Sequence, residues 1–353
     1  MLSARATSRT QLAIILLLTP AFFGCSADPE VAPKKKKASK KAQSAYIDAG
    51  AQGDSGASVE SDDDFSPDEA TSKCGTWLEC TNYHRASAGI APISEDRSLQ
   101  EGVTNHAKYM VQNKEVTHYE KVGKTGYTAS GEKAGKKSNV TGSNVQWEAR
   151  DAIDSWLQAP FHALNMLSPR LARSAYGQYY ADDGSQRMVF AAALNTSDGI
   201  DRSRVHEYPF VWPGDRTTVA LSYYYGENPD PLTSCPGYKA PAGVPLLAML
   251  GDGSSAVGTV EHSLTLDGVP VEHCEIDEAN YSHPSADAQK IGRDILKSRS
   301  AVLIVAKEPL APGGTYAVSV KGSGVSVDWT FRVSATPREY PGIPIEALRR
   351  HNR

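Results

Sequence analysis

Three side chains that suit acid–base chemistry or metal binding stand in one stretch of the chain, residues 117–167. They are His118, Glu132 in a Gly-Glu-Lys run, and His162. Two neutral imidazoles and one carboxylate can bind a divalent cation such as zinc and still leave positions open for water or a ligand. Without a metal, the same groups could move protons, with Glu132 orienting an imidazole or accepting a proton itself.

A simpler interpretation is that Glu132 and the two histidines form a polar network that ties a loop to a helix. The chain has no Gly-x-Ser-x-Gly run and no His-Glu-x-x-His run, which mark two common hydrolase classes. Ser130 is a possible nucleophilic hydroxyl, but a serine before glycine is typical of a turn. The sequence therefore favours binding over catalysis. His84 and His106 fall on expected helices and are interpreted as packing or surface histidines.

The elements around these residues follow from apolar spacing. A helix is expected over 148–158, because its apolar residues recur at steps of three and four. Since this helix would end at Pro160, it would deliver His162 close to a fixed point. Two amphipathic helices are expected earlier, over 76–86 and from Asp96 to Met110.

Two strands are expected after the reactive stretch, over 174–180 and 187–194. The Asp183-Gly184 pair between them suits a hairpin turn that needs positive φ. Helices and antiparallel strands in this order predict an α+β layered domain over residues 73–200.

Several short runs follow one another between Cys74 and Leu194. The runs are Asn82-Tyr83-His84-Arg85-Ala86-Ser87-Ala88-Gly89-Ile90-Ala91-Pro92-Ile93, His106-Ala107-Lys108-Tyr109-Met110, Thr117-His118, Gly131-Glu132, Trp156 and Pro160-Phe161-His162. Their order and spacing resemble bacterial members of the CAP superfamily, which is named for cysteine-rich secretory proteins, antigen 5 and plant pathogenesis-related proteins. The resemblance implies an α-β-α sandwich whose surface cleft holds two histidines and acidic residues. It assigns His118 and His162 as the cleft histidines and Glu132 as the first acid.

The chain departs from this pattern at the second acid. The expected position, three residues after Trp156, holds Ala159. Asp154 or Glu148 could replace the missing acid only if its helix face turns toward the cleft. A second Gly-Glu-Asn run, over 226–228, is interpreted as a decoy because it follows His162 instead of lying between the histidines. Lys133 and Phe161 also replace the usual Asn and Gly.

The N-terminus indicates export. Residues 1–24 combine a basic start with an apolar run too short to span a bilayer, as in a secretory signal peptide. The run ends in Phe-Phe-Gly before Cys25, which resembles the lipobox of bacterial lipoproteins and implies lipidation of Cys25. Residues 25–72 are lysine-rich and then rich in Asp, Ser and Gly, a composition that predicts a disordered tether. We expect an exported protein anchored to a membrane by its lipid.

Four cysteines remain after Cys25, an even number that suits disulfides in an exported protein. They allow three pairings, and proximity within the expected domains favours Cys74 with Cys80 and Cys235 with Cys274. A structural zinc site is the weaker alternative, because no pair has Cys-x-x-Cys spacing.

Residues 201–336 are punctuated by proline and glycine, and short β-rich runs between them predict a β-sandwich similar to Ig-like or fibronectin-type modules. The expected strands cover 217–225, 244–249, 257–266, 301–306, 315–320 and 325–333. Residues 281–300 are expected to form a loop or short helix, and residues 337–353 an exposed tail. No catalytic pattern occurs here, so a spacer or adhesive module is expected.

The 353 residues suffice for two domains, and a net charge of -4 gives no reason to expect a nucleic-acid partner. The leading interpretation is binding of a lipid, a cell-envelope component or a protein around His118, Glu132 and His162. A metal-dependent hydrolase or peptidase that uses the same residues is the first alternative. Adhesion through the β-sandwich is the second.

Overall fold

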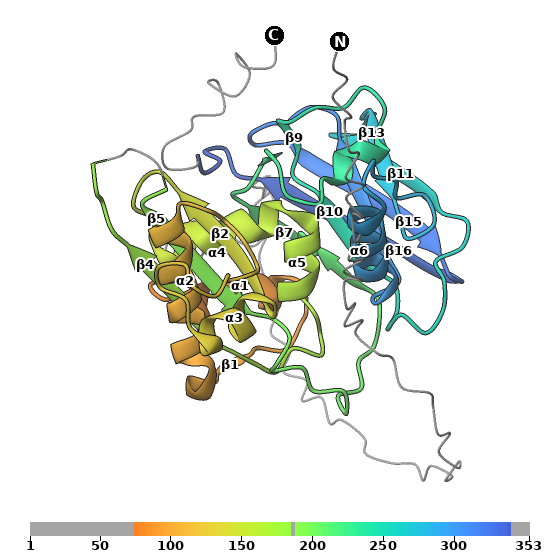
Figure 1. The fold of residues 1–353 in the computed structure, drawn as a ribbon. Coiled ribbons are helices and arrows are strands. Elements are labelled where there is room, and N and C mark those ends of the chain that lie inside the picture. The colour runs from red at the N-terminus through yellow and green to blue at the C-terminus, as the bar shows by residue number, and fades with distance from the viewer. Residues whose placement is uncertain (1–73, 185–187, 340–353) are drawn as a thin grey trace, which may run out of the picture. The chain divides into compact units, whose positions relative to one another are not determined.

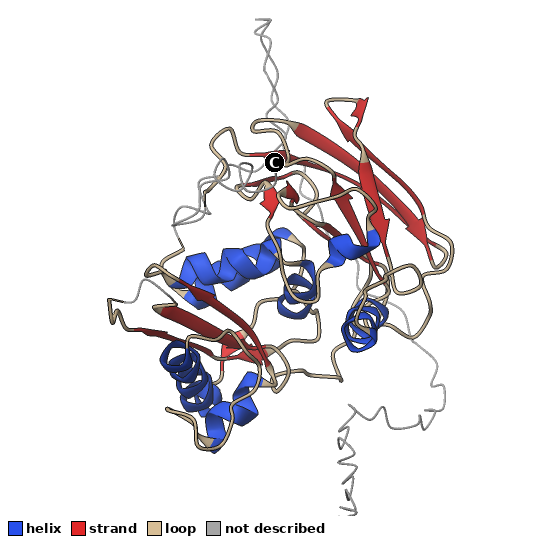
Figure 2. Cartoon of the chain, turned by 45° about the horizontal axis from the view of Figure 1, so that its top comes forward, coloured by secondary structure: helices blue, strands red, loops and turns tan. Residues whose placement is uncertain are grey.

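The structure is a computed structural model that describes residues 74–184 and 188–339. Its first region is built on an antiparallel sheet in the order β2 (Ser138–Ser143), β5 (Phe190–Asn195), β4 (Tyr176–Tyr180). Helices lie on both faces of this sheet (Figures 1 and 2). They are α1 (Trp77–Ser87), α2 (Gln100–Asn113), α3 (Ala129–Gly135), α4 (Ala149–Gln158) and α5 (Pro160–Met166).

The central strand β5 shows why the region is layered. Its side chains alternate between two separate hydrophobic clusters, because successive residues of a strand point to opposite faces. Phe190 and Leu194 pack with residues of α4 and α5, whereas Ala191 and Ala193 pack with residues of α2 and α3. The expected α-β-α arrangement is therefore confirmed. The remaining short elements are β1 (Ser94–Glu95), which pairs with β3 (Arg173–Ser174), and the 3-10 helix over Arg97–Leu99.

The junction of α4 and α5 places His162. Helix α4 ends at Gln158, and Ala159 takes an extended conformation with ψ of 101°. Pro160 then opens α5, where its fixed φ and missing N–H fit the first helical position. His162 therefore lies in the first turn of a new helix. The buried Trp156, 2 % exposed, anchors the preceding helix in the core.

The second region consists of two packed sheets, as the sequence predicted. One has the order β13 (His273–Ile276), β14 (Ala301–Ala306), β10 (Leu246–Met249), β6 (Phe210–Trp212). The other has the order β12 (Val269–Pro270), β11 (Glu261–Leu266), β15 (Thr315–Gly322), β16 (Val325–Val333), β7 (Thr217–Val219). A short ladder joins β8 (Tyr223–Tyr224) to β9 (Ala242–Gly243), and a 3-10 helix covers Pro231–Ser234.

Residues 281–300 are more regular than expected. They contain α6 (Ala286–Lys297), a helix of 12 residues capped by the side chain of Ser285. The disulfides Cys74–Cys80 and Cys235–Cys274 are both present, in the pairing that proximity favoured.

The two regions share one hydrophobic core, which continues from α1, α4 and α5 into both sheets of the second region. Phe161 packs edge-on against Tyr281 with ring centroids 5.2 Å apart. Gly214 approaches α1 so closely that a Cβ there would lie 1.6 Å from the carbonyl oxygen of Ser87. A side chain at residue 214 would therefore push the two regions apart. The domain boundary near residue 200 stays a prediction.

The start of the expected exposed tail is docked instead. The Arg338 backbone N–H donates to Ala220 O at 2.8 Å, and its guanidinium contacts the carboxylates of Asp151 and Asp154 on α4. The expectation of an exposed tail is wrong at this residue, because two buried carboxylates need a cation. The expected signal peptide, the expected lipidation site Cys25, the expected tether and residues 340–353 lie outside the described residues. Within residues 74–184 and 188–339, no helix is long and apolar enough to cross a membrane.

Candidate functional site

The loop between α2 and α3 carries His118 and is fastened by a buried pair. Glu120 Oε1 lies 3.1 Å from His106 Nδ1, and both side chains are 0 % exposed. His106 Nε2 lies 2.7 Å from Thr117 O, and the second oxygen of Glu120 accepts from Thr128 N at 2.8 Å. The interpretation of His106 as a packing histidine is consistent with this position. Its role is to hold the backbone next to His118.

His118 is held in one tautomer. Its Nδ1 lies 3.0 Å from Gly135 O at the end of α3. Because a carbonyl oxygen only accepts, Nδ1 carries the hydrogen and Nε2 keeps a lone pair. Burial is the main cause that lowers the pKa of His118, and the nearby His162 lowers it further. The imidazole is therefore neutral at neutral pH and can accept a hydrogen bond through Nε2.

Glu132 binds the backbone of the same loop. It sits in the first turn of α3, where it accepts a hydrogen bond from the backbone N–H of Glu120. Its other oxygen pairs with Lys136 Nζ at 2.5 Å. In the described part of the chain, no hydrogen bond joins Glu132 to His118 or His162. Glu132 therefore positions the loop and is not directly bonded to an imidazole.

His162 is paired with an acid from the second region. Its Nδ1 lies 2.7 Å from Glu227 Oε2, and the Glu227 side chain is only 1 % exposed. The other oxygen, Oε1, accepts from Phe161 N at 3.0 Å. Burial raises the pKa of Glu227, while His162 and the N–H groups of α5 oppose that rise. Since a carboxylate accepts, the hydrogen in this bond sits on Nδ1 of His162.

Glu227 is itself fixed by a short chain of hydrogen bonds. Its backbone N–H donates to Tyr224 Oη at 2.9 Å, and that hydroxyl donates to Asp230 Oδ1 at 2.8 Å. Tyr281 Oη donates to Asp230 O at 3.2 Å. The second region thus supplies a rigid support for the carboxylate that orients His162.

The Gly-Glu-Asn run over 226–228, interpreted from the sequence as a decoy, brings its glutamate into contact with His162, although it lies 65 residues later in sequence. The two other replacements considered do not reach this histidine. Asp154 is bonded to Arg338 and lies 3.4 Å from His84 Nε2, while Glu148 caps the N-terminus of α4, at the opposite end from His162.

The candidate metal ligands do not form a three-ligand site. Among residues 74–184 and 188–339, no group of three or more His, Cys, Asp or Glu side chains is placed to hold a metal ion. Glu132, the proposed third ligand, is engaged by Glu120 N and Lys136. A catalytic zinc ion normally has three protein ligands and one open position. The donor set around His118 and His162 does not fit such an ion.

Residues 78–193 match the model of the cysteine-rich secretory protein family, CAP. This segment is a CAP domain. It contains His118, Glu132 and His162, whereas Glu227 lies beyond the matched residues. The resemblance predicted from short motifs is confirmed. No curated protein matches the chain.

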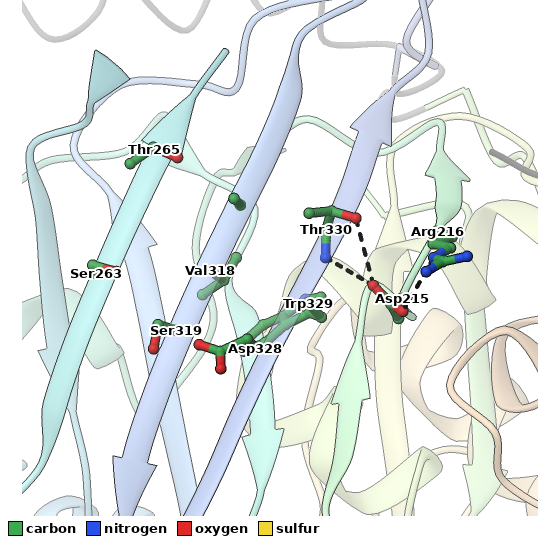
Figure 3. A pocket seen from close by; sticks show the side chains of 10 residues that line it. Asp215, Arg216, Ser263, Thr265, Val318, Ser319, Asp328, Trp329 and Thr330 are labelled. Carbon is green, nitrogen blue, oxygen red and sulfur yellow. Dashed lines mark hydrogen bonds and ion pairs between the residues drawn. The ribbon is translucent and has the colours of Figure 1, made fainter. Parts of the chain in front are cut away.

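A second candidate site lies outside the CAP domain. A hollow of about 440 Å³ lies on the outer face of the five-stranded sheet (Figure 3). Ser263, Thr265, Ser319 and Asp328 line it along β11, β15 and β16. Asp215 borders it and accepts from Thr330 N at 2.9 Å. No sequence motif marks this face, although short polar residues alternate with buried ones along β15 and β16.

Proposed function

We propose that the protein is an exported CAP-domain protein that binds a component of the cell envelope at His118 and His162. The observation that carries the proposal is the bond between His162 Nδ1 and the buried carboxylate of Glu227, 2.7 Å long. A buried acid that fixes one ring nitrogen fixes the tautomer, so the other nitrogen is held ready for a ligand. His118 is prepared in the same way by Gly135 O.

The two imidazoles define the chemistry of the ligand. In the Nδ1-protonated tautomer that these bonds select, each presents an Nε2 lone pair, and within the described residues neither Nε2 has a hydrogen-bond partner. Each therefore accepts a hydrogen bond from a hydroxyl or N–H group. Envelope polymers and lipid headgroups carry such donors. Lys133 is exposed in the adjoining α3, and Lys136, which pairs with Glu132, is exposed directly after it, so a ligand with an anionic group is favoured there.

A divalent cation between His118 and His162 is the alternative ligand. The observation in its favour is that both Nδ1 atoms are already bonded, as is usual for histidines that ligate a metal through Nε2. Water would have to complete the coordination. Because a third protein ligand is lacking among the described residues, we derive no hydrolytic step from such an ion.

The test uses a soluble peptidoglycan fragment, because its sugars and peptide supply hydroxyl and N–H donors. Binding by the full chain is measured by calorimetry for wild type, His118→Ala and His162→Ala, with His283→Ala as the control. We expect affinity to fall at least about tenfold in the first two variants, since each loses an acceptor worth roughly 1.4 kcal/mol. Equal affinity in all four proteins argues against the site. New products in wild type, absent in His118→Ala, would establish an enzyme instead.

Membrane anchoring through Cys25 is part of the same proposal. A lipid on this cysteine and a tether over 25–72 would hold the folded regions near the membrane surface. Fractionation of cells that express wild type or Cys25→Ser tests it. We expect the wild-type protein in the membrane fraction and the variant in the soluble fraction. Identical fractionation of both would reject the lipid anchor.

Adhesion through the second region is a second candidate function, and the hollow over β11, β15 and β16 favours it. Hydroxyls and the two carboxylates of Asp215 and Asp328 at a sheet surface suit a hydroxyl-rich ligand such as a saccharide. Deleting this region cannot test the idea, because it also supplies Glu227. Ser319→Arg, which fills the hollow, is the better variant. If Ser319→Arg no longer binds whole envelopes and His162→Ala still does, the binding surface is the five-stranded sheet and not the CAP domain.

A further inference from the structure

Two histidines from different sheets meet at one corner of the second region. His262 lies in β11 of the five-stranded sheet, and His273 opens β13 of the four-stranded sheet. His262 Nδ1 and His273 Nε2 are 2.9 Å apart, and the ring planes cross at 81°. Neither residue belongs to the CAP domain, and the proposed function uses neither of them.

The hydrogen bonds around the pair fix its protonation. His273 Nδ1 lies 2.7 Å from Val271 O, so this nitrogen carries a hydrogen and Nε2 keeps its lone pair. His262 Nδ1 must then donate to His273 Nε2. The lone pair of His273 points at His262.

This arrangement needs one small change to become a metal site. The proton on His262 Nδ1 can move, by exchange with water, to Nε2 of the same ring. Two lone pairs then face each other, and the ring keeps its neutral charge. Adjacent nitrogens on a tetrahedral zinc ion are about 3.3 Å apart when each Zn–N bond is about 2.0–2.1 Å. The observed 2.9 Å requires the rings to separate slightly and to turn so that both lone pairs point at one ion, and His262 is exposed enough to move.

The surroundings resemble those of metal-ligating histidines. A ligating imidazole usually donates its second N–H to a carbonyl or carboxylate, as His273 does to Val271 O. The next residue, Cys274, is disulfide-bonded to Cys235, which fixes the start of β13. Two nearby carboxylates, on Glu261 and Glu272, are paired with Lys321 and Lys307. The protein therefore offers two nitrogen ligands at this corner.

We propose that His262 and His273 bind a divalent transition-metal ion, such as Zn²⁺, Ni²⁺ or Cu²⁺, with water in the remaining positions. Imidazole nitrogens suit these ions, whereas Ca²⁺ and Mg²⁺ prefer oxygen ligands. The ion would bridge the two sheets by joining β11 to β13. This site is independent of His118 and His162.

Zinc calorimetry on the full chain tests the proposal. The starting protein carries His118→Ala and His162→Ala, so that the CAP domain contributes no imidazole pair. We expect zinc binding in this protein and a loss of at least about tenfold in affinity when His262→Gln is added, because one of two ligands is removed. Glutamine keeps a side-chain N–H that can donate to His273 Nε2, so the fold is retained. His283→Gln is the matched control and should leave the affinity unchanged.

Copper provides a second readout. The electron paramagnetic resonance spectrum of Cu²⁺ added at one equivalent should show coupling to two imidazole nitrogens in the starting protein and to one after His262→Gln. The proposal is overturned if the starting protein binds no zinc, or if His262→Gln changes neither the zinc affinity nor the copper spectrum. Zinc binding by the wild-type protein but not by the starting protein, which lacks His118 and His162, would assign the metal to the CAP domain and overturn the proposal.

Discussion

His162 Nδ1 donates to Glu227 Oε2 across 2.7 Å, and this bond joins the CAP domain to the second region. The position three residues after Trp156, where the CAP resemblance places an acid, holds Ala159 in this chain. The second region provides the acid instead, from a segment supported by Tyr224 and Asp230. The second region therefore contributes a residue to the candidate site.

Removal of the Glu227 carboxylate should destabilise the protein. Glu227→Ala leaves the N–H groups of His162 and Phe161 without their acceptor, and each buried unsatisfied group costs about 1–3 kcal/mol. Glu227→Gln keeps the shape and one of the two acceptor oxygens, so it should cost less, about 1 kcal/mol. The control is Glu308→Gln, an exposed carboxylate of the same region, which should change stability little. Urea denaturation measures all three, and equal midpoints for Glu227→Ala and Glu308→Gln would contradict the assignment.

Arg338 should contribute strongly to folding. Its guanidinium is 24 % exposed and contacts Asp151 and Asp154, which are 5 % and 6 % exposed. Arg338→Met removes the cation that pairs with both buried carboxylates, so we expect the free energy of unfolding to fall by about 3 kcal/mol. The control is Arg97→Met, because Arg97 is 90 % exposed and its ion pair should contribute less than about 1 kcal/mol. Similar urea midpoints for the two variants would count against the docked position of Arg338.

The two disulfides should differ in their effect on stability. Cys235 and Cys274 are 39 residues apart, and Cys74 and Cys80 are 6 apart. The longer loop loses more entropy on closure, so replacing its cysteines by alanine should cost about 4 kcal/mol, against about 2 kcal/mol for the shorter loop. Thermal unfolding under non-reducing conditions measures both double variants. A larger loss for the shorter loop would contradict the loop-entropy explanation.

Glu275 should make stability depend on pH. Burial, together with the charges of Asp277 and Glu278, raises the pKa of Glu275 from 4.5 to about 7. The folded state then binds more protons than the unfolded state between these values. Its stabilising contribution is complete below pH 4.5 and is lost as the pH rises through about 7. Urea denaturation at several pH values should show this decline relative to Glu275→Gln, and parallel curves for the two proteins would refute it.

The sequence predicted those helices and strands whose own pattern of apolar residues determines their secondary structure. The strands over 301–306 and 325–333 coincide with β14 and β16, because one is a continuous apolar run and the other alternates. Helix α4 was predicted from its apolar spacing to within a residue. Local pattern and tertiary packing agree in these segments.

Other elements depend on distant partners. The residues of β2 are mostly polar and include Gly142, a pattern typical of a loop. They form a strand because they pair with β5 along their whole length. Strand β13, which begins with His273, was not predicted for the same reason: its hydrogen bonds to β14 hold it in the extended conformation. Helix α6 was expected as a loop or short helix, but Gly292 lets it pack closely on Tyr281.

The candidate site was predicted only in part. The order of the CAP motifs identified His118, Glu132 and His162, because these lie in short recognisable runs. Glu227 was set aside because no local pattern relates it to a histidine 65 residues earlier. The only signal was its Gly-Glu-Asn run. The pairing arises from the shared core, which brings the loop after β8 against α5.

Nuclear magnetic resonance of the full chain with ¹⁵N-labelled histidine tests the central claim most directly. For wild type, the His162 signals should show hydrogen on Nδ1 and a lone pair on Nε2, with a strongly deshielded Nδ1 proton. In Glu227→Gln, this proton should move upfield because the acceptor has lost its charge, whereas Glu308→Gln should leave it in place. An unchanged Nδ1 proton in Glu227→Gln, or hydrogen on Nε2 in wild type, would mean that the second region does not complete the CAP site.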